Sequence, residues 1–547
     1  MNYSITDVPN SLHWHAAGWY RAERAIDEAE QFYTNSAKLW EGIGHQYLAI
    51  TSCVSISIPL EPRETQASAW FENIARSAWR KLREDHPAIA APVVYDSKTK
   101  LCKKVYDVPL GGYTCVEDWV QATLKTIDKG QSGAEFANED PPLGRYPTIY
   151  IVVPPSIDQD SDKRLLRRDI VFRSPHDIID GIGTLMLFNR LLENISKATS
   201  SPIGGFDPTW EYFDLRDLTP PLRIAACVSP SPGLPQLQKL KAIQEANKAA
   251  RTDAEVLSIP YKAGASMPLD SKRVSLYLSA KETYSIIAKC KECGATPTHA
   301  VHAAIALTVR DLQTRTSTKR KAKYISYALI NLRQSLKESW SYLDKNPPPP
   351  RNYVVALYHG ISASHLVVDL TVPSCSTPLP TPQESRDEFL QALSQVKIFY
   401  HNAKVDDDYL HAVPSLFREL TPPYSESLCE VPAPNPSPSV SLSSLGVVDK
   451  IIRRNYKGRS VPAFFEDGNC NTVGEVRDGF RDIFVDDAWV MGSEYGTGLG
   501  LFLKTFQGRM EVSAAYNEAF HDEEEVRGFL KDVKKWVFKG LGVIEDD

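Results

Sequence analysis

Two series of helix and strand patterns lie on either side of a proline-rich, charged segment in the middle of the sequence. Prolines cluster at 220–235 and are followed by a charged helical stretch, Leu237–Ala254, with few apolar positions. The chain has 547 residues, whereas single hydrophobic cores stop growing at about 250 to 300 residues. We therefore expect an N-terminal subdomain at 1–220, a crossover segment at 221–262 and a C-terminal subdomain at 263–547.

The first series predicts a subdomain of the α/β class. Apolar residues at near-helical spacing predict a helix within Trp14–Trp40, and a strand follows at Tyr47–Ile58. A strongly amphipathic helix is predicted at Gln66–Glu84, where the following proline ends it. Two more strands are predicted at Thr148–Val153 and Asp169–Phe172.

The second series predicts another mixed sheet with helices. Strands are expected where β-branched and aromatic residues dominate, and helices where alanine, leucine and charged residues recur. Prolines at 347–350, 372–384 and 431–439 predict surface connections. The predicted elements are strands at Arg273–Leu278, Tyr324–Ile330, Tyr353–Leu357, Leu499–Phe506 and Met510–Tyr516, and helices at Lys281–Lys291, Pro297–Leu312 and Glu523–Phe538.

Composition excludes several classes of protein. A net charge of -6 gives no reason to expect nucleic-acid binding. No apolar run is long enough for a membrane helix, and Met1–Leu12 does not resemble a secretory signal, so we expect a cytoplasmic protein. The sequence does not determine the oligomeric state, and a monomer is the simplest expectation. Nine scattered cysteines argue against a disulfide framework. Cys290 and Cys293 form a single CxxC without a second ligand pair, and we expect no metal.

One histidine motif has a context that suggests chemistry. His176 and Asp180 form an HxxxD pattern followed by Gly181, between a predicted strand and an amphipathic helix. A second match, His365 with Asp369, lies in an alternating apolar run, where residues four apart on a strand stand about 13 Å from each other. We interpret the second match as structural and the first as a site at the edge of a sheet.

The motif at His176 resembles that of the HxxxD acyltransferase superfamily, which contains chloramphenicol acetyltransferase, BAHD acyltransferases and condensation domains. Further segments are similar to its fungal secondary-metabolite branch, nearest to the trichothecene 15-O-acetyltransferase-like enzymes: Cys290–Ala304, Ala328–Arg333, Ser443–Asp449 and Tyr516–His521. The resemblance implies two chloramphenicol-acetyltransferase-like subdomains, each a mixed sheet with helices, with an active-site tunnel at their interface.

The resemblance also implies roles for individual residues. His176 would be the general base, since a neutral imidazole can take a hydroxyl proton at cytosolic pH. Asp180 would pair with Arg333 and, with Gly181, support the histidine loop. Ser443 and Ser444 are candidates for contacting the oxyanion or the substrate. The implied cosubstrate is acetyl-CoA or another acyl-CoA, with no bound cofactor.

The predicted function is acyl-CoA-dependent O-acyl transfer, O-acetylation foremost, to a hydroxyl of a small secondary metabolite such as a sesquiterpenoid. One alternative is a stand-alone condensation-type enzyme that uses a carrier-protein thioester or an amine acceptor. Pro175 weakens it, because condensation domains usually have a second histidine there. Another alternative is a binding or cyclisation scaffold without acyl transfer.

Three other features have ordinary structural interpretations. Plant BAHD enzymes carry a DFGWG segment, and Glu494–Gly500 occupies a comparable position without matching it; its glycines predict a hairpin turn. The basic run at 315–323 predicts a solvated loop. His299 and His302 have helical spacing and are predicted to lie in or beside the core.

Overall fold

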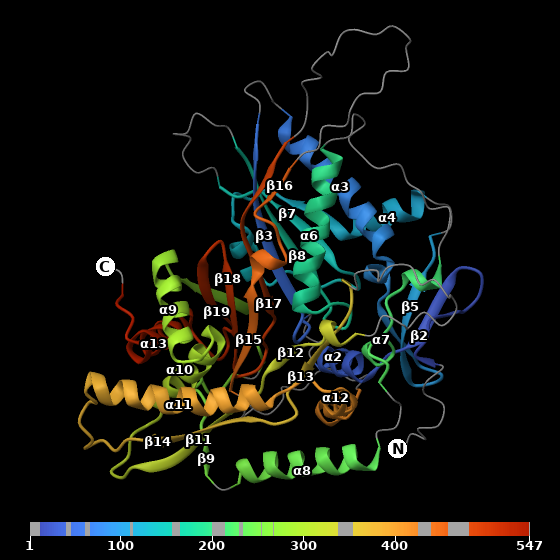
Figure 1. Ribbon diagram of the computed structural model, residues 1–547. Helices are drawn as coiled ribbons and strands as arrows, with labels where there is room; N and C mark the ends of the chain where they lie inside the picture. Colours follow the sequence, from blue (N-terminus) through green and yellow to red (C-terminus); the bar gives the residue numbers. More distant parts are fainter. Residues whose placement is uncertain are drawn as a thin grey trace.

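The computed structural model of the chain describes residues 11–39, 45–60, 66–109, 113–155, 165–199, 214–228, 233–252, 254–265, 267–336, 354–424, 439–457 and 481–545. The predicted loop at 347–350 and nearly all of the connection at 431–439 lie outside these ranges. Within them the chain forms two lobes of the α/β class, as the sequence predicted, each with its own buried apolar cluster (Figure 1). None of the described helices combines the length and the hydropathy of a membrane span.

The first lobe is built on a six-stranded sheet that α3 (Ala67–Asp85), α4 (Tyr113–Thr123) and α6 (Gly181–Ala198) accompany. Leu185, Leu191 and Leu192 of α6 are buried in the same apolar cluster as residues of the sheet. The strands, in spatial order, are β16 (Asn455–Tyr456), β17 (Ile483–Gly492), β3 (Ile50–Pro59), β8 (Leu165–Ser174), β7 (Thr148–Val152) and β6 (Leu124–Ile127).

The second lobe contains a four-stranded sheet and a three-stranded sheet packed with helices. Its four-stranded sheet has the order β10 (Ser271–Tyr277), β19 (Arg509–Asn517), β18 (Leu499–Phe506) and β15 (Val440–Val447). The three-stranded sheet has the order β14 (Leu366–Val372), β11 (Arg320–Ser326) and β9 (Glu255–Val256). The helices are α9 (Ala280–Glu292), α10 (Pro297–Asp311), α11 (Pro382–Asn402) and α13 (Glu523–Leu541).

The predicted helix within Trp14–Trp40 is wrong in its first half. The structure has β1 (His15–Ala16) and β2 (Arg21–Ala25) there, and α2 begins only at Glu28 and ends at Lys38. Asp27 accepts a hydrogen bond from the Glu30 amide, and Glu30 returns one to the Asp27 amide, so a capping box starts the helix. β2 pairs with β5 (Leu101–Asp107), which in turn pairs with β4 (Val93–Asp96).

The predicted strand at Tyr353–Leu357 is also absent from its described part, 354–357. β13 begins later, at His359–Ile361, and pairs with β12 (Leu329–Asn331). The carbonyl of Ala356 accepts from the Asp180 amide at 3.2 Å, and the Tyr358 amide donates to the Asp180 carboxylate at 2.9 Å. These buried main-chain groups therefore bond to the loop of the histidine motif instead of to a neighbouring strand.

The two lobes exchange a segment. β16 and β17 follow β15 in the chain, yet they complete the sheet of the first lobe, where β17 pairs antiparallel with β3. Residues 493–498 then lead back to β18 in the second lobe, so the predicted hairpin turn is wrong and this segment is an inter-sheet crossing. The boundaries proposed at 220 and 263 separate the chain by position along the sequence. The lobes do not follow this division, because β16 and β17 lie after residue 263 and yet belong to the sheet of the first lobe.

Three helices complete the architecture near the junction of the lobes. α7 (Leu222–Ala225) and α8 (Leu234–Ala250) occupy the predicted crossover segment, and α12 (Asp407–Leu420) contacts both α2 and α8. Figure 1 shows α8 as a long helix along one side of the molecule. Leu240 is its one buried residue, which agrees with the few apolar positions in its sequence.

Candidate active site

A cavity of about 840 Å³ lies where elements of both lobes meet. Its wall includes residues of α2, α8, α12, β12, β13 and β15, the turn after β8 and the crossing after β17. All the site residues predicted from sequence are among them: His176, Asp180, Gly181, Arg333, Ser443 and Ser444. Pockets that hold small ligands commonly have about 300 to 1,000 Å³ of space, so this cavity has the size of a substrate site.

The turn that carries His176 is fixed by the start of α6. β8 ends at Ser174, and Asp180 caps α6 by accepting a hydrogen bond from the Gly183 amide at 2.7 Å. A Cβ atom at Gly183 would lie 2.4 Å from the carbonyl oxygen of Val354, so no other residue fits there. At Gly181 a Cβ atom would make ordinary contacts. The close approach that requires glycine is therefore at 183, two residues later than the motif itself suggests.

Asp180 is the centre of a buried ionic cluster. Its Oδ2 accepts from Arg333 Nη1 at 2.9 Å and lies 3.5 Å from His359 Nδ1. Burial by itself would raise the pKa of Asp180, but Arg333 and His359 lower it well below the usual range. The carboxylate is therefore ionised, and it accepts hydrogen bonds from Arg333 and from the Gly183 and Tyr358 amides.

His176 is half-buried in the cavity wall, and its ring stacks on that of Tyr33. The two ring centroids are 3.8 Å apart and the planes are inclined by 15°. Nδ1 of His176 is buried without a hydrogen-bond partner. Burial, with a contribution from His359, lowers the pKa of His176 to about 3. The imidazole is accordingly neutral at physiological pH and has a lone pair available to accept a proton.

Tyr33 and His359 belong to the surroundings of His176 and were not identified from the sequence. The Tyr33 hydroxyl lies 2.7 Å from His359 Nε2, and His359 in turn faces Asp180. A chain of contacts therefore runs from Arg333 through Asp180, His359 and Tyr33 to the face of the His176 ring. Tyr33 belongs to an apolar helical face, and His359 follows a run of apolar residues, so neither position carries a motif.

The two candidate serines differ in their surroundings. Ser441 and Ser443 alternate along β15 with Val440 and Leu442, which are buried in the core of the second lobe. Ser443 thus lies on the side of the strand that borders the cavity. Ser444 is exposed, and its Oγ lies 2.9 Å from Thr298 Oγ1. Ser443 is the better placed of the two to meet a ligand.

The second HxxxD match does not form a compact pair. Asp369 is exposed on β14, whereas His365 precedes that strand and borders the cavity. Cys290 is buried in the core, and burial raises the pKa of its thiol to about 12, so it is not a reactive group. His302 is also buried, with Nδ1 at 3.1 Å from the Tyr400 hydroxyl, as expected for a core histidine.

One group in the described part of the chain is close enough to hold a cation: His45, Asp140 and Asp270. Asp140 already accepts from Arg173 Nη2 at 3.0 Å and from the Ser271 amide at 3.1 Å. Burial raises the pKa of Asp140, but His45 and Arg173 lower it to about 2. The protein itself neutralises this carboxylate, and we assign no metal to the group.

The chain is similar in sequence and in structure to fungal acetyltransferases. No family model matches the chain. The chain is 25% identical to the O-acetyltransferase pigM of Monascus ruber over 482 residues, which cover 86% of this chain and 77% of that protein. Among solved structures it resembles the TRI3 trichothecene 15-O-acetyltransferase from Fusarium sporotrichioides, with a TM-score of 0.71, 16% identity and coverage of 97% and 98% of the two chains.

The chain therefore has the chloramphenicol-acetyltransferase-like fold. The first condensation domain of the calcium-dependent antibiotic synthetase shares it, with a TM-score of 0.55, 12% identity and coverage of 97% and 98% of the two chains. The two lobes of the acyltransferase fold, each with a mixed sheet, are those that the motif at His176 led us to expect. In this acyltransferase fold the cavity between the lobes contains His176.

Proposed function

We propose that the chain is an acyl-CoA-dependent O-acyltransferase that transfers an acetyl group from acetyl-CoA to a hydroxyl of a small secondary metabolite, such as a sesquiterpenoid. The observation that carries the proposal is a neutral imidazole at position 176, stacked on Tyr33 in the wall of a cavity of about 840 Å³. The names of pigM and TRI3, both O-acetyltransferases, support the same reaction.

The reaction needs one base and one donor from the protein. His176 takes the proton of the acceptor hydroxyl as its oxygen bonds to the thioester carbonyl carbon. The carbonyl oxygen becomes an oxyanion, which the Ser443 hydroxyl stabilises. The carbon–sulfur bond then breaks, the protonated His176 returns its proton to the CoA thiolate, and the ester leaves. Asp180 and Arg333 hold the loop of His176 and do not contact the reacting atoms.

A transfer assay tests the proposal. Purified protein is incubated with radiolabelled acetyl-CoA and a panel of polycyclic alcohols, and labelled ester is measured. We expect transfer by the wild type and a loss of at least about a hundredfold in His176→Ala, the range that general-base catalysis supplies. His401→Ala, an exposed histidine at the end of α11, is the matched control and should be fully active. Equal activity of His176→Ala and wild type would contradict the assignment.

The same panel separates the competing functions. Amines and a carrier-protein acetyl thioester are offered in parallel with alcohols and acetyl-CoA. Transfer to amines, or from the carrier protein alone, would indicate a condensation-type enzyme, whereas binding of alcohols without any transfer would indicate a scaffold. Pro175, where condensation domains usually have a histidine, supports the alcohol acceptor.

A further inference from the structure

A second titratable side chain, Glu494, borders the cavity that contains His176. Its carboxylate accepts from the Gly496 amide at 2.7 Å and is hydrogen-bonded to the Tyr47 hydroxyl. Tyr327 lies close enough to interact electrostatically with it and is itself hydrogen-bonded to Ser441. Tyr47, Tyr327 and Ser441 also border the cavity, so Glu494 is part of a polar patch on the wall. Nothing in the proposed acyl transfer uses this patch.

The register of the six-stranded sheet fixes where Glu494 lies relative to His176. Ser174 of β8 pairs with Ile50 of β3, and Ile50 pairs with Gly492 of β17. His176 follows Ser174 by two residues, and Glu494 follows Gly492 by two residues. Both side chains therefore emerge from the same edge of the sheet, with one strand between them. Two strand spacings amount to roughly 10 Å.

The main-chain groups of Glu494 form hydrogen bonds of their own to the second lobe. Its amide donates to the Ser271 hydroxyl at 2.9 Å, and its carbonyl accepts from Asn517 Nδ2 at 3.3 Å. These bonds tie the crossing after β17 to the beginning of β10 and the end of β19. The junction of the lobes thus sets the position of the Glu494 main chain, which carries the carboxyl group to the cavity wall.

The chemistry of the patch suits an uncharged polar group of a ligand. Burial raises the pKa of Glu494 to about 7, so near neutral pH both the carboxyl and the carboxylate form are present. A hydroxyl group can bind either form, because it donates to a carboxylate and accepts from a carboxyl. The anionic phosphates of CoA would be repelled by the carboxylate. The patch therefore suits the acceptor better than it suits the phosphates of CoA.

We propose that Glu494 and Tyr47 bind a second hydroxyl group of the acceptor, which selects rigid polycyclic diols whose two oxygens lie roughly two strand spacings apart. The inference rests on the proposed O-acyl transfer, since it takes the reacting hydroxyl to lie at His176. Glu494 is then a specificity residue: it holds the far end of the acceptor while His176 deprotonates the near end.

Binding of a matched pair of steroids tests the inference without relying on catalysis. Androstanediol carries a hydroxyl at each end of a rigid ring system, and androstanol lacks one of them. Calorimetric titration in the absence of acetyl-CoA gives the dissociation constant of each. We expect the wild type to bind the diol about tenfold more tightly, the range of one or two net hydrogen bonds.

The variants distinguish recognition from a structural role. Glu494→Leu should bring the two dissociation constants to within about twofold of each other, while Glu494→Gln, which can donate and accept, should keep the preference. A purely structural role would weaken both ligands equally and leave their ratio unchanged. Glu139→Leu, at an exposed acid away from the cavity wall, is the control. If Glu494→Leu does not fold, Tyr47→Phe carries the test and should reduce the preference several-fold.

Several results would overturn the proposed hydroxyl-binding role of Glu494 and Tyr47. Equal affinity of the wild type for both steroids, no binding of the diol, or an unchanged ratio in both Glu494→Leu and Tyr47→Phe overturns the inference. Acetyl transfer is measured separately on the same protein. A diol preference that depends on Glu494 without any transfer refutes the proposed function and leaves the hydroxyl site standing. Transfer without such a preference refutes the site alone.

Discussion

At the scale of single residues, Asp180 is the group on which the site depends most. Its side chain is 5% exposed and that of Arg333 is 12% exposed. We expect Asp180→Asn to lower the free energy of unfolding by about 3 to 5 kcal/mol, because Arg333 is left as a buried charge without its counterion. Chemical denaturation followed by circular dichroism measures this change. Normal stability together with lost activity would contradict the structural role of Asp180.

A double variant provides the control for that effect. Arg333→Met in the Asp180→Asn background removes the orphaned charge, so the two substitutions together should cost clearly less than the sum of their separate costs. Additive costs would show that the two side chains do not act as a pair.

Tyr33 allows the stacking contact to be separated from the hydrogen bond. Tyr33→Phe keeps the ring against His176 and removes only the hydroxyl that bonds to His359, whereas Tyr33→Ala removes both contacts. We expect a decrease in kcat of less than about tenfold for the phenylalanine variant and of about a hundredfold for the alanine variant, since misplacement of a base by an ångström has an effect of this size.

The KM for acetyl-CoA should stay within about twofold of wild type in both Tyr33 variants, because only the position of His176 changes. Equal loss in the two variants would assign the effect to the hydroxyl and not to the stacked ring. Unchanged kcat in Tyr33→Ala would show that the ring does not hold the base.

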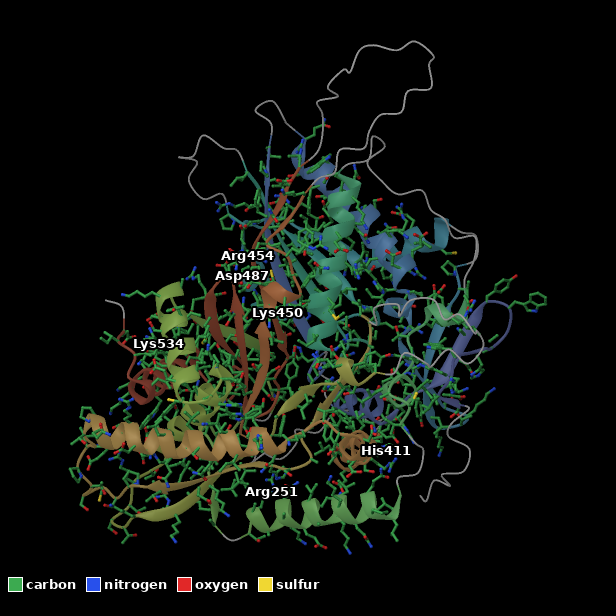
Figure 2. All side chains as sticks on the ribbon, in the orientation of Figure 1. Arg251, His411, Lys450, Arg454, Asp487 and Lys534 are labelled. Atoms are coloured by element: carbon green, nitrogen blue, oxygen red, sulfur yellow. The ribbon has the colours of Figure 1, made fainter. Side chains whose placement is uncertain are left out.

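At the scale of elements, α8 brings cationic and polar groups to the cavity. Asn247 donates to the Ala363 carbonyl at 2.8 Å and accepts from the His365 amide at 2.9 Å, which fixes the end of the helix. Arg251 directly follows α8 (Figure 2). It is exposed and borders the cavity. Burial and the nearby Arg251 lower the pKa of His365 to about 4. An arginine in this place suits the phosphates of an acyl-CoA.

We expect Arg251→Ala to raise the KM for acetyl-CoA about tenfold, the effect of one charge-assisted hydrogen bond, while the KM for the alcohol stays the same. The increase should shrink at high ionic strength, where the wild type also loses the attraction. Lys248→Ala on the same helix is the control, since Lys248 is exposed and is not among the residues of the cavity wall. An unchanged KM at low salt would place the CoA phosphates elsewhere.

At the scale of the whole molecule, the exchanged segment makes the two lobes depend on each other. β17 lies within the sheet of the first lobe, and its Trp489 packs in one buried cluster with Phe136 and Val171, against which Phe502 of β18 rests. The chain continues from β17 to β18 through the anchored crossing at Glu494. Neither lobe therefore has a complete set of strands from a continuous part of the chain.

We expect the two lobes to unfold together. Urea unfolding followed by far-ultraviolet circular dichroism and by tryptophan fluorescence should give coincident transitions, the usual sign of a single cooperative unit. Two separated transitions would show that the lobes are independent domains, as the linear boundaries at 220 and 263 suggest.

The sequence by itself determined the α/β class, most of the elements and the strand–turn–helix that presents His176. These depend on periodicity and on nearest neighbours in the chain: the apolar run Ile170–Phe172 within β8 and the apolar face of α6. The pairing partner Arg333 came from resemblance and not from spacing. Between Trp14 and Trp40, the near-helical spacing of apolar residues predicted one helix, whereas the structure has two short strands and then a helix that begins with a capping box.

Only the tertiary structure decided which distant residues share the cavity. His359, Tyr33 and Glu494 belong to three separate elements, and no spacing in the chain relates them to His176. Their convergence follows from sheet order and register, above all from the insertion of β17 beside β3. Strand pairing between residues hundreds of positions apart is fixed by the packing of whole faces, and periodicity within one strand carries no information about its partner.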